Sequence, residues 1–178
     1  VPGSQTITES IGNYWDTRLC RTTNNGQLWE LLPSAAASDV NLFIRYHPGD
    51  PSVVYAGDKI SHDSGATFVP LDFGAFDNPT LVGMCETSPD VVYAMDSERR
   101  SILRSVDRGQ SWTAYTTPGW RFRKVDALPT FAAHPTDSAL VYSVDAAGDL
   151  AVYDGDSWRS LHVLDGFGGP SFNFVRTV

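Results

Sequence analysis

The chain of 178 residues has little cysteine and few basic residues, and each shortage excludes a class of function. Its two cysteines, Cys20 and Cys85, allow at most one disulfide and match no metal-binding or redox spacing, so we expect buried free thiols. Lys and Arg number 13 against 21 Asp and Glu, and the net charge of −8 argues against a binder of nucleic-acid backbones. We therefore expect no metal, no cofactor and no nucleic-acid partner.

Long hydrophobic runs are also missing. No apolar run approaches the roughly 18 to 20 residues that cross a bilayer, so we expect no membrane insertion. The start, Val1-Pro2-Gly3-Ser4, lacks an initiator Met and a signal-peptide pattern, which indicates a chain trimmed or excised from a longer one. A content of 42% hydrophobic and 19% charged residues is typical of a folded globular core.

One short phrase, which we call the box turn, repeats along the chain. Residues 61–68 and 105–112 share Ser, Asp, Gly, a hydroxyl residue and an aromatic residue at matching positions. Residues 22–29 form a third copy, with Thr for Ser and Asn for Asp. Residues 153–158 form a fourth copy that is less similar to the others. Its glycines recur at intervals of about 40 to 45 residues, at Gly26, Gly65, Gly109 and Gly155.

A second phrase, a Pro/Asp turn followed by a β-branched and aromatic run, precedes three of the box turns. Its copies are residues 47–55, 88–93 and 134–142. Pro and Asp favour turns, and the run after them favours a strand. Each unit then reads as strand A, Pro/Asp turn, strand B, short turn, strand C, box turn and strand D, without helical periodicity. Four antiparallel strands in such a repeat predict an all-β fold, a β-propeller of four-stranded blades.

We predict a single propeller region over residues 1–178, with four blades. Their approximate ranges are 7–33, 40–72, 80–115 and 129–162. Residues 171–178 read as another strand A. Either this strand completes the first blade and closes a four-bladed disc, or the chain is an open arc of a larger propeller. The arc is favoured, because closure with so few blades demands a strong twist between them.

The box turn has a structural explanation. Its Asp or Asn can accept backbone hydrogen bonds, its Gly takes a positive φ, and its aromatic residue fills the space between neighbouring sheets. We therefore assign structural roles, not catalytic ones, to Thr22, Asn24, Gly26, Trp29, Ser61, Asp63, Gly65, Phe68, Ser105, Asp107, Gly109, Trp112, Gly155 and Trp158.

The phrase Ser/Thr-x-Asp-x-Gly-x-Thr/Ser-Trp/Phe resembles the Asp-box, or BNR repeat. This repeat occurs in sialidases, sortilin-like receptors, family 74 glycoside hydrolases (xyloglucanases) and photosystem assembly factors. Residues 47–57 are most similar to the xyloglucanase and sortilin-type branches. The resemblance covers about residues 11–158 and implies a propeller, but hydrolases, receptors and assembly factors all use the same box.

Candidate binding residues lie away from the box turns, in the B–C turns and the D–A connections. Three residues after each strand B tyrosine stands an aspartate, which suits an acidic rim for a cation, a basic protein or sugar hydroxyls, or simply caps its own turn. The D–A connections carry aromatic and basic side chains that suit glycan stacking or protein docking, although an edge strand explains them equally well. The candidates are Asp58, Asp96, Asp145, Phe76, Trp120, Arg121, Phe122, Arg123 and Phe167.

No matched pair of catalytic acids is evident, so we assign no catalytic residue. In the xyloglucanase branch the resemblance implies acids in a cleft between two propellers, and the Thr-Asp-x-Gly-Gly phrase expected after Val54-Tyr55-Ala56 is missing. The arginine triad of a sialidase is missing as well. The leading hypothesis is a non-catalytic interaction or structural module with a glycan or protein partner, in a secreted, surface or virion-type protein. The alternative is a fragment of a secreted xyloglucanase-type hydrolase acting on β-glucan. A longer parent chain or oligomerisation would supply the missing blades.

Overall fold

The computed structural model is built from antiparallel β-strands. It describes residues 7–13, 16–32, 44–77, 79–96, 101–116, 131–144 and 149–163. Within these ranges all elements of regular secondary structure are β-strands, and no helix is present that could span a membrane. The chain divides into two compact units, Val1–Asp72 and Phe73–Val178, and each unit holds two sheets.

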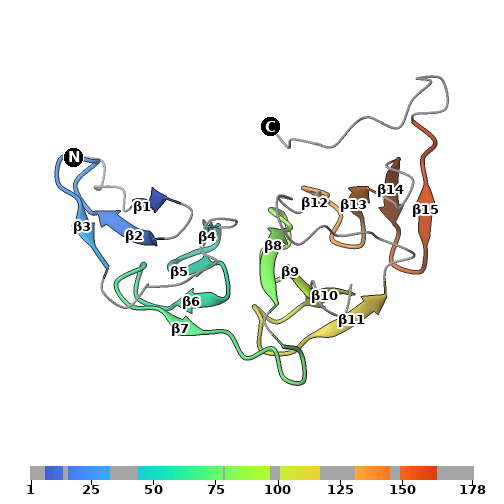
Figure 1. Ribbon diagram of the computed structural model, residues 1–178, viewed down its shortest axis with the longest axis horizontal. Coiled ribbons are helices and arrows are strands. Elements are labelled where there is room, and N and C mark those ends of the chain that lie inside the picture. The colour runs from blue at the N-terminus through green and yellow to red at the C-terminus, as the bar shows by residue number, and fades with distance from the viewer. Residues whose placement is uncertain are drawn as a thin grey trace. The chain divides into compact units, whose positions relative to one another are not determined.

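The first unit contains a three-stranded and a four-stranded sheet, both ordered as in the sequence (Figure 1). The strands of the first sheet are β1 (Ile7–Asn13), β2 (Asp16–Thr22) and β3 (Glu30–Leu31). The strands of the second sheet are β4 (Ile44–His47), β5 (Asp50–Ala56), β6 (Lys59–Ser61) and β7 (Val69–Pro70). Every neighbouring pair is antiparallel.

The second unit contains two four-stranded antiparallel sheets. The strands of the third sheet are β8 (Thr80–Met84), β9 (Val92–Asp96), β10 (Ser101–Ser105) and β11 (Thr113–Thr116). The strands of the fourth sheet are β12 (Phe131–Ala133), β13 (Val141–Val144), β14 (Leu150–Tyr153) and β15 (Trp158–Ser160). Three sheets therefore show the predicted order of strands A, B, C and D. In the first sheet the described strands are B, C and D, and residues 171–178 lie outside the described ranges.

The turns between strands A and B are held by their own polar side chains. In the second sheet, Asp50 Oδ1 accepts hydrogen bonds from Ser52 Oγ at 2.6 Å and from Ser52 N at 3.2 Å. In the fourth sheet, His134 Nδ1 accepts a hydrogen bond from Asp137 N at 3.0 Å, and Asp137 Oδ1 accepts one from Ala139 N at 2.9 Å. Hydrogen bonds from backbone N–H groups to side chains thus stabilise the turns of the second repeated phrase.

The hydrophobic core of each unit lies between its two sheets. In the first unit, Leu19 and Leu32 from the first sheet pack with Val54, Ala56 and Phe68 from the second. Burial of these apolar side chains is the main favourable term that holds the two sheets together. Cys20, next to this cluster in sequence, is a buried free thiol, as expected from its spacing.

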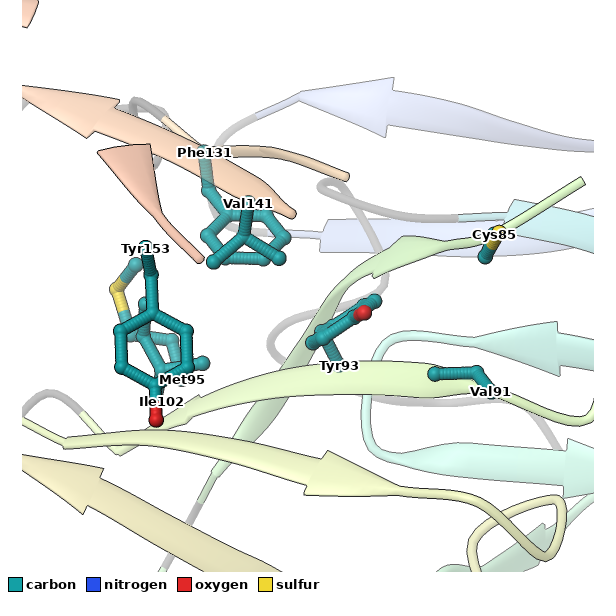
Figure 2. Packing of buried hydrophobic residues seen from close by; sticks show 8 residues of the cluster. All are labelled: Cys85, Val91, Tyr93, Met95, Ile102, Phe131, Val141 and Tyr153. Carbon is teal, nitrogen blue, oxygen red and sulfur yellow. The ribbon is translucent and has the colours of Figure 1, made fainter. Parts of the chain in front are cut away.

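In the second unit the core joins the third and fourth sheets, as Figure 2 shows. Its buried residues are Cys85, Val91, Tyr93, Met95, Ile102, Phe131, Val141 and Tyr153. The rings of Tyr93 and Phe131 lie 5.5 Å apart between centroids, in a tilted arrangement that is favourable for aromatic pairs. Cys85 is a buried free thiol as well.

Candidate functional site

The box turn at residues 61–68 is closed by a network of hydrogen bonds. Ser61 Oγ donates to Asp63 Oδ1 at 2.8 Å and accepts a bond from the N–H of Gly65 at 2.8 Å. Asp63 Oδ1 also accepts the N–H of Thr67 at 2.8 Å, and Oδ2 accepts the Thr67 hydroxyl at 2.7 Å. Both carboxylate oxygens are therefore engaged within the turn.

The other two full-length box turns repeat this network. Asp107 Oδ1 accepts bonds from Ser105 Oγ at 2.6 Å and from Ser111 N at 2.8 Å. Asn24 Oδ1 accepts the N–H of Leu28 at 2.9 Å, so its amide oxygen replaces the carboxylate. These hydrogen bonds stabilise the turn between strands C and D.

The same bonds lower the pKa values of the two box carboxylates. Asp63 has its pKa lowered from 3.8 to about 2, chiefly by the hydrogen bond from the Thr67 side chain. Asp107 has its pKa lowered from 3.8 to about 2, chiefly by the bond from the Ser105 side chain. Hydrogen bonds to the charged form favour that form. Both groups therefore stay ionised at neutral pH and are poorly suited to act as a general acid.

Two consecutive residues with positive φ form each full-length box turn. The glycines lie at φ of 82°, 81° and 90°, and the residue before each also has a positive φ, near 60°. These preceding residues are Asn25, Ser64 and Arg108. Sequence reasoning anticipated the glycines but not their neighbours, because Ser and Arg adopt this conformation only when the surrounding turn holds them there.

The fourth box turn is shorter than the others, and its aspartate was missed. Asp154 Oδ1 accepts bonds from Asp156 N at 3.2 Å and Ser157 N at 3.1 Å, while Gly155 has a φ of 96°. The backbone bond from Ser157 is the main cause of the lowered pKa of Asp154. The Asp-Gly pair in the sequence was the signal that could have identified it.

The aromatic residues that end the box turns differ in burial. Phe68 is buried, Trp112 and Trp158 are half-buried, but Trp29 remains 42% exposed. The prediction that Trp29 fills a gap between sheets is therefore not met within the described residues. Trp158 lies 5.4 Å from Tyr153 between ring centroids, and Tyr153 lies 5.0 Å from Tyr115 of the third sheet. The aromatic residue thus faces the preceding sheet, and for Trp29 the described ranges contain no preceding sheet.

The end of each sheet opposite its box turn is the candidate binding end, because the B–C turns and D–A connections lie there. In the second sheet this end carries Asp58, whose side chain is 41% exposed and lies 3.3 Å from Lys59 Nζ. The Asp58 carbonyl accepts the N–H of Leu71, which ties the D–A connection to the turn. Asp58 is thus a surface carboxylate with a cationic neighbour.

Asp96 occupies a different environment, although it follows its tyrosine at the same distance as Asp58. It is fully buried at the end of β9, paired in register with Ser101. The β9–β10 ladder extends two residues further beyond the tyrosine than the β5–β6 ladder, so the aspartate falls inside the ladder instead of in the turn. The expected rim of equivalent surface carboxylates is therefore not seen at these two positions.

Of the remaining binding residues predicted from the sequence, only Phe76 lies within the described ranges. Phe76 is half-buried in the connection after the second sheet, and its N–H donates to the Phe73 carbonyl at 3.4 Å. The others, which carry most of the aromatic and cationic character, lie outside the described residues: Trp120, Arg121, Phe122, Arg123, Asp145 and Phe167.

Asp149 is a buried carboxylate at this end that sequence reasoning missed. It is only 7% exposed, and its Oδ1 accepts the N–H groups of Leu150 at 2.7 Å and Val163 at 2.9 Å. Ser160 Oγ lies 3.4 Å from Oδ2. The tripeptide Ala-Gly-Asp at 147–149 repeats that at 56–58, and this repetition was the available signal. These bonds connect the start of β14 with the end of β15 and the residues after it.

The candidate end therefore offers surface recognition more readily than acid–base chemistry. Among the described aspartates of this end, Asp58 is an exposed ion-pair member, Asp72 and Asp77 are exposed in the connection after the second sheet, and Asp96 and Asp149 are buried. Within the described ranges no three His, Cys, Asp or Glu side chains gather in a way that could hold a metal ion.

Comparison with known proteins bears on the fold. No family model matches the chain, and no curated protein matches it. An ancestral GH74 enzyme matches 90% of this chain and 25% of its own, with a TM-score of 0.60 and 13% identity. The GH74 xyloglucanase from Xanthomonas campestris matches 88% of this chain and 23% of its own, with a TM-score of 0.61 and 17% identity. The chain has a β-propeller fold.

Each sheet is accordingly one blade, and the predicted all-β propeller class is confirmed. This chain spans about a quarter of the length of the two solved propellers. At 13% and 17% identity the likeness concerns the fold alone, because one propeller scaffold serves many unrelated functions.

Proposed function

We propose that the chain is a non-catalytic propeller module that presents its candidate binding end to a glycan or protein partner, in a secreted, surface or virion-type protein. The observation that carries this proposal is that four described carboxylates are held within the fold and do not face a substrate site. Asp63 and Asp107 are engaged inside box turns, and Asp96 and Asp149 are buried. None of these four is placed to exchange a proton with a bound substrate.

The partner chemistry follows from the connection at residues 116–127. Its sequence brings Trp120 and Phe122 together with Arg121 and Arg123, a combination of flat apolar rings and cationic donors. Aromatic rings stack on the apolar faces of sugar rings, and Arg with aromatic residues is enriched at protein-binding surfaces. A neutral or acidic glycan is the first candidate, because one solved propeller of this fold is a xyloglucanase.

The proposal is tested on the 178-residue chain with a glycan array that includes xyloglucan oligosaccharides, together with affinity capture from a surface-protein extract. We expect a bound partner that is not cleaved, and about tenfold weaker binding in Trp120→Ala. Val106→Ala is the matched control, because Val106 is exposed on a box turn at the opposite end. Binding of neither class, or a Trp120→Ala variant that binds as the wild type does, would contradict the proposal.

A hydrolase of xyloglucanase type is the second candidate, favoured by the two GH74 matches. In that case Asp58, an exposed carboxylate at a B–C turn of the candidate binding end, is the group to test. The experiment measures reducing-sugar release from a soluble β-glucan by the wild type and by Asp58→Asn, with Glu86→Gln as an exposed carboxylate control at the opposite end of its sheet. Release that disappears in Asp58→Asn alone establishes catalysis, and no release at all excludes this candidate for the chain.

A further inference from the structure

The first box turn, between β2 and β3 (Figure 1), carries the only Asn-Gly pair in the chain, Asn25-Gly26. Both residues are exposed and have a positive φ, of 58° for Asn25 and 82° for Gly26. The second and third box turns carry Ser64 and Arg108 at the position of Asn25, with nearly the same φ. The turn therefore sets the conformation of this position, and of the three full-length turns only the first places a side-chain amide there.

An asparagine followed by glycine undergoes a reaction that is closed to the residues in the other two turns. The backbone nitrogen of Gly26 loses its proton and attacks Cγ of Asn25. A C–N bond forms in a five-membered succinimide ring, and the side-chain amide takes up a proton and leaves as ammonia. Water then opens the ring at either carbonyl, which gives aspartate or isoaspartate. Glycine favours the attack, because it has no Cβ to obstruct the nitrogen.

In the folded turn, Thr22 holds the attacking nitrogen. The N–H of Gly26 donates to Thr22 Oγ1 at 3.0 Å, and the N–H of Asn24 donates to the same oxygen at 3.4 Å. The proton of the Thr22 hydroxyl is directed to Asn24 Oδ1, 2.9 Å away. Lone pairs of Oγ1 therefore face Gly26 N, so the hydroxyl stabilises the N–H and has no proton to offer the nitrogen anion. Thr22 is only 1% exposed, which keeps water from taking its place.

The neighbouring amide, that of Asn24, is protected by its bonds and by the residue after it. Asn24 Oδ1 accepts the Leu28 N–H at 2.9 Å in addition to the Thr22 hydroxyl, so its side chain is fixed within the turn. The residue that follows is Asn25, whose Cβ obstructs an attack on Asn24 Cγ, whereas Gly26 has none. Asn24 therefore serves as an internal reference for Asn25 in the same peptide.

We propose that Asn25 is a spontaneous deamidation site and that the Thr22 hydroxyl sets its rate. While the first box turn is closed, Gly26 N stays bonded to Thr22 and the reaction is slow. When the turn opens, this bond is lost, the backbone leaves the positive φ, and the nitrogen reaches Cγ of Asn25. The rate therefore follows the fraction of time for which the turn is open. The co-reactants are water and hydroxide, so the reaction requires neither an enzyme nor a bound partner.

Isoaspartate at this position removes the spacing on which the closed turn depends. Its backbone runs through the side-chain carbon, so the chain between Asn24 and Gly26 becomes one carbon longer. The N–H groups of Gly26 and Leu28 each bond to the side chain of the fourth residue before them, and the added carbon lies within both spans. The modified chain thus loses the closed turn between strands C and D of the first blade, and it gains a negative charge there.

The test incubates the 178-residue chain in mildly alkaline buffer, with peptide mapping by mass spectrometry and enzymatic methylation of isoaspartate as readouts. We expect isoaspartate at Asn25 and none at Asn24. Thr22→Val keeps the branched side chain but removes the hydroxyl, and it should react about tenfold faster because the turn opens more often. Ser61→Ala removes the equivalent bond in the second box turn and should leave the rate at Asn25 unchanged.

A second variant tests the same chemistry if Thr22→Val does not fold. Ser64→Asn places an Asn-Gly pair in the second box turn, where Ser61 Oγ accepts the N–H of Gly65 at 2.8 Å. Isoaspartate should form at position 64, and faster when Ser61→Ala is added. Asn25→Ser, with the residue that the second turn carries naturally at the same φ, should give no isoaspartate in the first turn.

Three results would overturn the proposal. Asn25 that stays intact in both the wild type and Thr22→Val excludes the site. Equal rates in the wild type and Thr22→Val exclude control by the hydroxyl. A rate at Asn25 that rises as much in Ser61→Ala as in Thr22→Val traces the effect to the stability of the whole unit instead of the Thr22 bond. None of these results depends on a glycan or protein partner, so the proposed function is judged separately.

Discussion

Gly83 on β8 lies against the ring of Phe131 on β12. A Cβ atom at position 83 would stand 2.8 Å from Phe131 Cε1 and 3.4 Å from the Cβ of Ala133. The absence of a side chain at this position therefore lets the innermost strands of the third and fourth blades approach each other. Phe131 in turn packs on Tyr93, so the close approach at Gly83 is continuous with the core of the second unit.

Gly83→Ala should destabilise the protein, because the new methyl group must displace a packed ring or separate two blades. Overpacking of this kind costs about 1 to 3 kcal/mol in the free energy of unfolding. Gly49→Ala is the matched control, since its Cβ would meet His47 Cε1 at an ordinary 3.5 Å. Urea denaturation of both variants checks the prediction. Equal stability of the two would show that Phe131 moves aside without cost.

Gly83 shows why packing could not be predicted from the sequence while the strands could. The β-branched runs, the Pro/Asp turns and the spaced glycines each act on neighbouring residues, so local rules predict strands and turns correctly. Contact between Gly83 and Phe131 joins residues far apart in the chain, and a glycine within an apolar run gives no sign of what approaches it. The exposure of Trp29 is another such case, because its local sequence matches that of the buried Phe68.

The box carboxylates make stability depend on pH in a defined direction. Asp63 has a folded pKa of about 2 against the ordinary 3.8, so folding favours its ionised form. Its contribution is complete above about pH 4 and is lost as the pH falls through 2. Asp63→Asn keeps one acceptor oxygen, as Asn24 does naturally, but loses this charge. The variant should be less stable than the wild type at pH 7, and the difference should shrink between pH 4 and 2.

Denaturation midpoints measured across pH 2 to 7 for the wild type and Asp63→Asn check this expectation. Glu86→Gln, an exposed carboxylate outside the box turns, serves as the control. A stability difference that is the same at pH 7 and pH 2.5 would mean that the charge of Asp63 contributes nothing.

The candidate binding end was predictable only in part, and Asp58 and Asp96 show the reason. Both follow a strand B tyrosine by three residues, and the sequence pattern treats them alike. Whether such a residue is exposed depends on how far the strands B and C stay paired. That length is set by side-chain packing across the ladder, which a turn motif does not encode.

The rings of Phe73 and Trp112 lie in a tilted arrangement with centroids 4.9 Å apart, and they offer a test of the aromatic position in the box turn. Phe73→Ala should cost about 3 kcal/mol, because the ring is buried. Trp112→Phe should cost less than about 1 kcal/mol, since its buried Nε1 has no hydrogen-bond partner among the described residues. Thermal unfolding compares the two with Phe76→Ala, a half-buried control. A large loss in Trp112→Phe would indicate a partner for Nε1.

Tyr93 and Arg104 share one acceptor on the fourth blade. The Tyr93 hydroxyl donates to the carbonyl oxygen of Ser138, and Arg104 Nε donates to the same oxygen at 3.3 Å. Either donor alone keeps that oxygen satisfied, so Tyr93→Phe and Arg104→Ala should each cost about 1 kcal/mol. The double variant should lose more than the sum of the two, by about 0.5 to 1 kcal/mol in a double-mutant cycle.

The pH dependence of stability reports on the burial of the Tyr93 phenol. Burial raises the pKa of Tyr93 above its ordinary 10.0, so folding favours the neutral phenol. Its contribution is complete below pH 10 and is lost as the pH rises through the folded pKa. Tyr93→Phe should therefore lose less stability between pH 9 and 11 than the wild type, as followed by urea denaturation. A wild-type loss identical to that of Tyr93→Phe would mean that Tyr93 does not resist ionisation in the folded protein.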